Sequence, residues 1–216
     1  MSSKKKLFGG KHGTVVLHKK KIPKGSRQYI LLEQKRATLN AGDFKQSIRL
    51  PPDTPIDDWL AANTVDFYNE LLVLMDSLLD CCSVTVCTTM CAGPKYQYLW
   101  QDGGRYKSPT NVPAHTYISL LFQWIDELLD NKSVFPPDPE VPFPKNFKDV
   151  VKSIFKRLFR VYAHFYYHHL PDIREAELEA NFNTAFRHFY TFVDEFHLIS
   201  SSELEPLKEI IQSFSS

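Results

Sequence analysis

The sequence predicts a mainly all-α protein, a helical bundle with a small β-hairpin. Three observations lead to this prediction. Four segments of the 216-residue chain repeat apolar residues at helical spacing. One further segment alternates apolar and polar residues and then reaches an Asp-Gly-Gly turn, which is typical of a hairpin. With 43% hydrophobic and 24% charged residues, a chain of this length can bury a substantial core as one domain.

The first segment differs in composition from the rest. Residues 1–24 are Lys-rich and interrupted by Gly, which predicts a flexible basic tail ahead of a helical domain over residues 25–216. The start has cations but lacks the apolar core of a secretory signal, and no apolar run approaches the roughly 18 residues of a membrane span. We therefore expect a cytoplasmic protein that can also enter the nucleus. The formal net charge of +1 provides no general attraction to nucleic acid.

The first long helix is expected over residues 54–79. Thr54 suits the N-cap, Pro55 the first helical position and Asp57 the third position of a capping box. An apolar stripe at helical spacing then predicts deep burial of one face. The stripe consists of Leu60, Thr64, Phe67, Leu71, Met75 and Leu78.

The hairpin and the remaining helices follow in order. Residues 96–109 predict the hairpin, with its turn at Asp102, Gly103 and Gly104. Residues 135–147, "FPPDPEVPFPKNF", predict a rigid Pro-rich connector. The later helices are expected at residues 113–131, 146–170 and 179–196, with a short closing helix at residues 204–214.

Cysteines and histidines are spaced as in zinc sites. The four cysteines lie between positions 81 and 91, and Cys82 and Cys87 form a C-x4-C pair. His164 offers two partners on its own helix, His168 at H-x3-H or His169 at H-x4-H spacing. Two thiolates and two imidazoles suit a tetrahedral structural zinc, because four protein ligands leave no open position for water. The alternatives are packing thiols and a histidine cation at a helix end.

The choice between the two histidines stays open on geometry alone. Four residues rotate about 40° past a full helical turn, which favours His168, whereas five place the rings about 140° apart. However, Pro171 disfavours helical conformation at Leu170, so the last turn can loosen and let His169 swing round.

Three cations lie near the middle of the same helix. Lys156, Arg157 and Arg160 lie at positions i, i+1 and i+4, so they share one side of the helix. Arg side chains bind phosphate oxygens in a bidentate manner, with Lys as a supplementary charge. A solvated helix face is the alternative interpretation.

Several blocks together resemble one family, the Mob kinase-activator proteins, and within it the members that bind NDR/LATS kinases in Hippo-type and mitotic-exit signalling. The resemblance runs from about residue 20 to the end of the chain and contains several independent blocks in the right order. These blocks are "IPKGSRQYILLEQKRATL", "LPPDTPIDDWLAANTVDFYNE", "CTTMCAGPKYQY", "VPFPKNF" and "KRLFRVYAH".

The resemblance implies a helical bundle and assigns its site residues. It implies a structural zinc ion held by Cys82, Cys87, His164 and His169, and so prefers His169 over His168. It implies that Lys156, Arg157 and Arg160 bind a phosphothreonine segment of an upstream Hippo-class kinase.

Further implied positions concern kinase binding and phosphorylation. Asp58, Trp59 and Asp66 match an acidic and aromatic surface that meets the basic regulatory region of the NDR/LATS kinase, with core packing as the alternative for Trp59. The chain departs from the family at Thr54 and Pro55, where acidic residues are usual, and this weakens the negative patch. Thr38 matches one phosphorylation site, and Thr14 is the nearest candidate for a second.

The function predicted from these implications is a monomeric, non-enzymatic adaptor and co-activator of NDR/LATS-type kinases. A zinc-dependent hydrolase is the alternative, but the chain has no H-E-x-x-H helix and no Gly-rich phosphate loop. A third hypothesis is a nucleic-acid binder that uses the Lys-rich tail, but the near-neutral net charge does not favour it.

Overall fold

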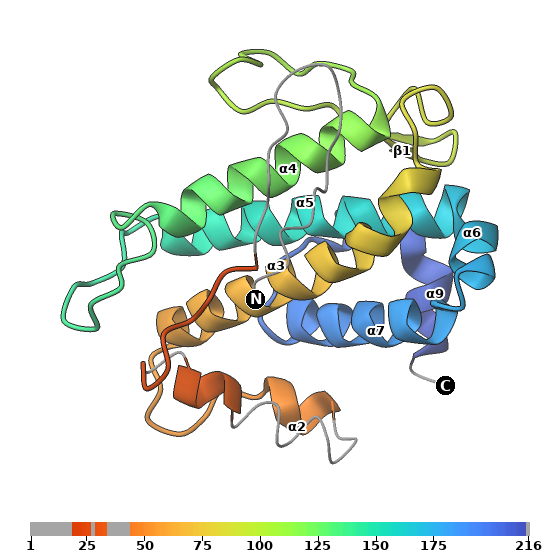
Figure 1. Cartoon of the computed structure of the whole chain (residues 1–216). Coiled ribbons are helices and arrows are strands. Elements are labelled where there is room, and N and C mark those ends of the chain that lie inside the picture. Colours follow the sequence, from red (N-terminus) through yellow and green to blue (C-terminus); the bar gives the residue numbers. More distant parts are fainter. Residues whose placement is uncertain (1–18, 27–28, 34–43, 215–216) are drawn as a thin grey trace, which may run out of the picture.

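The computed structural model describes residues 19–26, 29–33 and 44–214. Within these ranges the protein is mainly helical, as the sequence predicts, with one small antiparallel sheet (Figure 1). The long helices are α3 (Ile56–Leu78), α4 (Ala114–Asp130), α5 (Phe147–His168) and α7 (Glu179–Glu195). The shorter elements are α2 (Phe44–Ile48), η1 (Leu79–Cys81), β1 (Cys91–Ala92), β2 (Tyr96–Gln97), α6 (Leu170–Glu175), α8 (Ser201–Leu204), η2 (Glu205–Leu207) and α9 (Lys208–Ser213).

Helix α5 forms the centre of the bundle. It contacts α3, α4 and β1, and α7 packs against α3 (Figure 1). Apart from the partly buried Val150, its apolar positions from Phe147 to Phe165 are almost completely inaccessible to solvent. Polar groups on this buried side of α5 therefore require partners.

Aromatic side chains join the helices. The Phe67 ring of α3 meets Phe155 of α5 edge to face at 5.6 Å and Phe189 of α7 at 5.7 Å. Phe155 stacks on Phe192 of α7 at 5.5 Å. Such pairs contribute about 0.5–1.5 kcal/mol each beyond the burial of their area. This cluster holds the three helices in register and fixes the direction of α5.

Two local predictions were wrong in detail. Helix α3 begins at Ile56 with Pro55 at the N-cap, and no side chain caps it. The Thr54 hydroxyl instead lies 3.4 Å from the carbonyl oxygen of Pro52, because the extended backbone of Pro55 (ψ 136°) delays the helix by one residue.

The paired strands begin upstream of the predicted hairpin and overlap it only at Tyr96 and Gln97. Cys91 pairs with Gln97 and Ala92 with Tyr96, around a turn in which Gly93 has φ 67°. A side chain at Gly93 would also meet the Tyr167 ring, with its Cβ 2.8 Å from a ring carbon. The predicted turn at residues 102–104 is present, but it closes only a single bridge between Trp100 and Thr110.

Candidate metal centre and cation patch

Four thiol and imidazole groups meet at one end of α5. Cys82 follows η1, Cys87 closes the next turn, His164 lies in the penultimate turn of α5, and His169 follows its last residue. The Cys82 Sγ lies 3.3 Å from His164 Nε2, and the Cys87 Sγ lies 3.2 Å from His169 Nε2. All four ligand atoms are within 4.8 Å of one another, and all four residues are buried. This group could hold a metal ion.

The other ring nitrogen of each histidine is also bonded. His164 Nδ1 donates to the carbonyl oxygen of Cys91 at 2.8 Å, and His169 Nδ1 donates to Asp172 Oδ2 at 2.9 Å. These bonds fix the tautomer in which Nε2 carries the lone pair. Histidines that bind metals in proteins almost always have such an outer partner.

The spacing of the ligand atoms fits zinc. With Zn–S of about 2.3 Å and Zn–N of about 2.0–2.1 Å, a tetrahedral ion holds its sulfur and nitrogen ligands about 3.5 Å apart. The separations of 3.3 and 3.2 Å require only a small expansion around an ion. Two sulfur and two nitrogen donors also match the ligand preference of zinc.

Burial shapes the electrostatics of this group. It lowers the pKa of His164 to about 4, so the imidazole stays neutral and able to bind a metal. It raises the pKa of the Cys82 and Cys87 thiols, because no cation offsets the loss of water around a thiolate. A divalent cation would supply that charge and convert both thiols to thiolates.

The structure separates the two competing histidines. His169 has φ −128°, outside the helical range, and its Nε2 reaches Cys87 Sγ at 3.2 Å inside the buried group. The loosened last turn foreseen from Pro171 therefore exists. His168 remains on the helix, and its Nε2 faces Cys91 Sγ at 3.4 Å, outside the buried group.

The three predicted cations lie together, but they are packed rather than freely solvated. The Arg157 Cζ lies over two nearly perpendicular rings, Trp100 at 4.6 Å and Trp124 at 4.4 Å, and its Nη2 donates to Gln101 O at 2.8 Å. Stacking of this kind holds the guanidinium plane in place. The sequence interpretation as a solvated helix face is therefore wrong for Arg157.

Arg160 and Lys156 share one carboxylate. Arg160 Nη2 lies 3.6 Å and Lys156 Nζ 3.7 Å from Glu203 of α8. Arg160 also donates to the Tyr117 hydroxyl at 3.1 Å and lies over the Tyr98 ring at 5.0 Å. We call Lys156, Arg157 and Arg160 the cation patch.

Two buried donors of the cation patch have no hydrogen-bond acceptor. They are Arg157 Nη1 and Arg160 Nε. An unsatisfied buried donor costs about 1–3 kcal/mol. The patch as a whole has three cations against the single carboxylate of Glu203, so an anion at its surface would complement the remaining charge.

The predicted kinase-binding positions differ in accessibility. Trp59 is 1% exposed, and its Nε1 donates to the carbonyl oxygen of Ile48 at 3.1 Å, so its side chain belongs to the core. Asp58 is also buried, at 8% exposure. Asp66 is partly exposed and lines a cavity of about 500 Å³ together with residues 20–24. Thr14 and Thr38 lie outside the described residues.

The structure also shows contacts that sequence reasoning missed. Lys20, within the predicted tail, binds Asp126 at 2.8 Å and Asp130 at 2.7 Å. Its backbone N–H donates to Asn69 Oδ1 at 2.8 Å, and Asn69 Nδ2 donates to its carbonyl oxygen at 3.0 Å. Glu203 of the cation patch was likewise missed. The sequence offered one pattern for the Lys20 contact, the i, i+4 spacing of Asp126 and Asp130 on one helix face. It offered no pattern that places Glu203 beside the cation patch.

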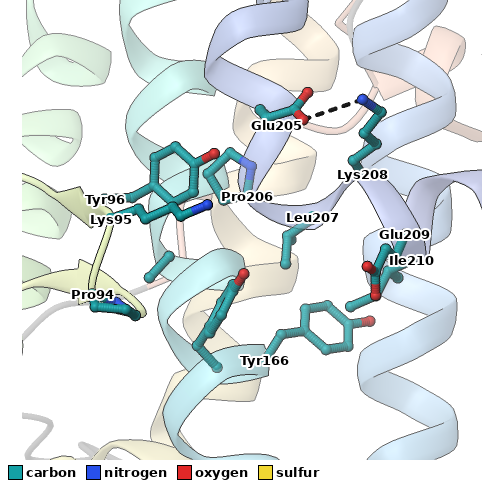
Figure 2. Close-up of a pocket in the computed structure, with 12 residues that line it drawn as sticks. Pro94, Lys95, Tyr96, Tyr166, Glu205, Pro206, Leu207, Lys208, Glu209 and Ile210 are labelled. Carbon is teal, nitrogen blue, oxygen red and sulfur yellow. Dashed lines mark hydrogen bonds and ion pairs between the residues drawn. The ribbon is translucent and has the colours of Figure 1, made fainter.

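A cavity of about 510 Å³ lies beside the sheet, between it, the end of α5 and the closing helices. Figure 2 shows Tyr96 and Tyr166 facing Pro206 and Leu207 across it. Among the described residues, no helix is both long and apolar enough to cross a membrane.

These features define a class of protein, a helical bundle with a buried Cys2His2 group at one end of its central helix. The profile of the Mob1/phocein family matches residues 36–207. The chain is 47% identical over 208 residues to MOB kinase activator-like 1A of Arabidopsis thaliana, covering 96% of this chain and 97% of that protein. It is 45% identical over 206 residues to MOB kinase activator-like 1 homolog C of Dictyostelium discoideum, covering 95% of each. The chain belongs to the Mob1/phocein family, which confirms the predicted resemblance.

Proposed function

We propose that the chain is a non-enzymatic adaptor that binds and co-activates serine/threonine kinases of the NDR/LATS type. The observation that carries this proposal is its similarity, over at least 95% of both chains, to proteins named as kinase activator-like. Activating a kinase is a regulatory task that requires docking surfaces rather than a catalytic centre.

The metal group supports this assignment. In the proposal Cys82, Cys87, His164 and His169 bind one structural zinc ion. Four protein ligands leave no position for the water that a zinc hydrolase activates, which argues against the alternative. Elemental analysis of the purified protein should find about one zinc per chain, and its absence would remove this part of the proposal.

The cation patch is the proposed site for a phosphothreonine segment of an upstream Hippo-class kinase. A phosphothreonine carries about −1.5 to −2 charge and three acceptor oxygens at neutral pH. Lys156, Arg157 and Arg160 would supply the positive charge and N–H donors that such a group requires. Stacking on Trp100 and Trp124 already orders Arg157, so binding would lose little side-chain entropy.

The phosphate site is tested by titration with a phosphothreonine peptide and its unphosphorylated twin. Replacing Arg157 and Arg160 with Ala should weaken binding of the phosphopeptide at least about tenfold, or about 1.4 kcal/mol. An Arg→Lys pair should recover only part, because charge remains but the bidentate fork is lost. Lys152→Ala, an exposed cation on the same helix, is the matched control. Equal binding of both peptides by the wild type would leave the patch without this role.

The proposed docking face for the basic regulatory region of the kinase contains Asp58, Trp59 and Asp66. Because Asp58 and Trp59 are buried, Asp66 is the member available for direct contact. Lys20, Lys21 and Lys24 line the same cavity as Asp66, so this face already accommodates a basic segment of the chain itself. A basic segment of a kinase has the same charge complementarity.

The adaptor proposal is tested with a purified NDR/LATS-type kinase. The wild-type protein should bind the kinase regulatory region and raise kinase activity. Asp66→Lys should slow association, most clearly at low salt. Glu140→Lys, an exposed reversal on the Pro-rich connector, is the control. A chain that neither binds nor stimulates such a kinase would refute the proposal, and a parallel metal-dependent hydrolysis screen should find no activity.

A further inference from the structure

A second pair of metal-binding atoms lies beside the buried group. Cys91, the first residue of β1, and His168, the last residue of α5, bring Sγ and Nε2 to 3.4 Å. This separation is nearly the same as the 3.3 and 3.2 Å of the two pairs in the buried group. Unlike the members of that group, His168 is exposed and Cys91 is only partly buried.

The backbone around this pair is held in place. The Cys91 carbonyl oxygen accepts from His164 Nδ1 at 2.8 Å, and Cys91 pairs with Gln97 in the sheet. The Gly93 N–H points at His168 Nε2 at 3.4 Å. This long contact uses the lone pair that a metal would need, so an ion bound at Nε2 displaces the Gly93 N–H. The backbone bonds of Cys91 hold its side of the pair in place before any ligand arrives.

His164 is near both residues, but it is already committed. Its Nδ1 is bonded to the Cys91 carbonyl, and its Nε2 faces Cys82. It is the only further member of the Cys91 and His168 group among the described His, Cys, Asp and Glu residues. A metal ion at the pair would thus have two protein ligands and two positions left for water.

We propose that Cys91 and His168 form a second, open metal site at the surface, selective for zinc-class ions such as Zn²⁺ and Cd²⁺. One thiolate and one imidazole favour these ions over Mg²⁺ and Ca²⁺, which take oxygen ligands. With half the protein ligands of the buried group and contact with solvent, the site binds more weakly and exchanges its ion. Bound metal joins the last residue of α5 to the first residue of β1.

Ala92, Pro94 and Tyr167, which are close to Cys91 and His168 in the chain, line the cavity of about 510 Å³ beside the sheet. A metal ion at the pair would join the sheet to the end of α5 next to these residues.

The experiment titrates the full chain with Cd²⁺ in a phosphine reductant, after dialysis has left only tightly held zinc. Formation of the Cd–thiolate bond is followed by its ultraviolet charge-transfer band, and bound metal is counted by elemental analysis. The wild type should bind one further equivalent beyond the tightly held ion. Cys91→Ser and His168→Gln should each weaken that equivalent at least about tenfold, since even the loss of an outer partner costs 10–100-fold in metal affinity.

A matched control separates this site from its closest rival. Cys81 is the other partly buried thiol, and it forms a further group with His169 and Asp172. Its thiol donates to the Leu78 carbonyl oxygen at 2.8 Å, so we expect Cys81→Ser to retain the second equivalent. Loss of that equivalent in Cys81→Ser, or its persistence in both Cys91→Ser and His168→Gln, would overturn the proposal. So would wild-type protein that takes up no second equivalent.

The count also distinguishes the two metal proposals. If the buried group holds no zinc, dialysed protein contains no metal, but the equivalent sensitive to Cys91→Ser still appears on titration. If the surface pair holds none, dialysed protein contains one zinc and takes up no more. His168→Gln alters an exposed side chain, so it keeps the test decisive even where Cys91→Ser fails to fold.

Discussion

Helix α5 carries two polar groups, the metal group at its C-terminal end and the cation patch near its middle, and the protein satisfies them to different degrees. In the metal group, both ring nitrogens of His164 and of His169 have a thiol, carbonyl or carboxylate partner. In the cation patch, the guanidinium groups are packed and partly bonded, yet Arg157 Nη1 and Arg160 Nε have no acceptor among the described residues. A closed polar group of the first kind contributes to stability, whereas an open one of the second kind favours binding. Variants of the metal group and of the cation patch should therefore differ in how they change stability and binding.

The largest effect is expected from removing a ligand of the metal group. Cys82→Ser removes one of the four proposed ligands. Structural zinc contributes about 10–16 kcal/mol to folding in small zinc domains, which is as much as the whole stability of a typical protein. The variant should aggregate or lose its cooperative thermal transition, as measured by circular dichroism. Cys81→Ser should melt like the wild type. A Cys82→Ser protein with the wild-type melting temperature would show that this end is not a metal centre.

The next largest effect concerns Arg157, a packed arginine of the cation patch. Arg157→Met keeps an unbranched stem but loses the stacking on Trp100 and Trp124 and the bond to Gln101. The free energy of unfolding should fall by about 1–3 kcal/mol, measured by urea denaturation. Lys156→Met, at a side chain that is 40% exposed, should change it by less than about 0.5 kcal/mol. Equal losses in both variants would remove the distinction between packed and solvated cations.

A smaller effect is expected from a variant that makes the cation patch bind phosphate more tightly. Glu203→Gln removes the negative charge that now pairs with Lys156 and Arg160. Because this carboxylate competes with a phosphate for the same cations, phosphopeptide affinity should rise about three- to tenfold, or about 0.6–1.4 kcal/mol. Calorimetric titration would measure it, with Glu205→Gln as the neighbouring control. A fall in affinity would instead place Glu203 among the residues that contact the peptide.

The smallest effect sets the scale for a surface ion pair outside α5. Lys20→Met breaks the pairs with Asp126 and Asp130. We expect a loss of about 1 kcal/mol, which for a protein of this size lowers the melting temperature by about 2–4 °C, and less in high salt. The exposed Lys24→Met should have no measurable effect. A loss as large as that of Arg157→Met would show that surface pairing and stacking cannot be separated by size.

Local sequence patterns predicted the features that depend on neighbouring residues. The long helices follow from apolar periodicity, and the break at His169 lies two residues before Pro171, whose nitrogen has no hydrogen to continue the helical bonds. The preference for His169 came from the family resemblance, since helical geometry alone pointed to His168. Geometry at the bend supports the resemblance, because His169 is no longer helical.

Features that depend on distant residues could not be predicted. Arg157 stacks on rings 57 and 33 positions away, and no local pattern indicates that Trp100 and Trp124 converge there. The same holds for Glu203 beside Arg160. Trp59 was assigned to a surface because the resemblance names the residue but does not say which way its side chain points. Thr54 was misplaced because Pro55 can be either the first helical residue or an extended N-cap.

The two bonds between Asn69 and residue 20 have a consequence for how this protein tolerates change. Asn69 forms hydrogen bonds only with the main-chain N–H and carbonyl of residue 20. These two bonds fix the position of the backbone and do not depend on which side chain the residue carries. Most amino acids at position 20 would keep both bonds, although they would lose the ion pairs. Proline would not, because it has no N–H to donate. Residue 20 can therefore be substituted by most amino acids, and the Asn69 side-chain amide still holds the backbone at the same place on the bundle.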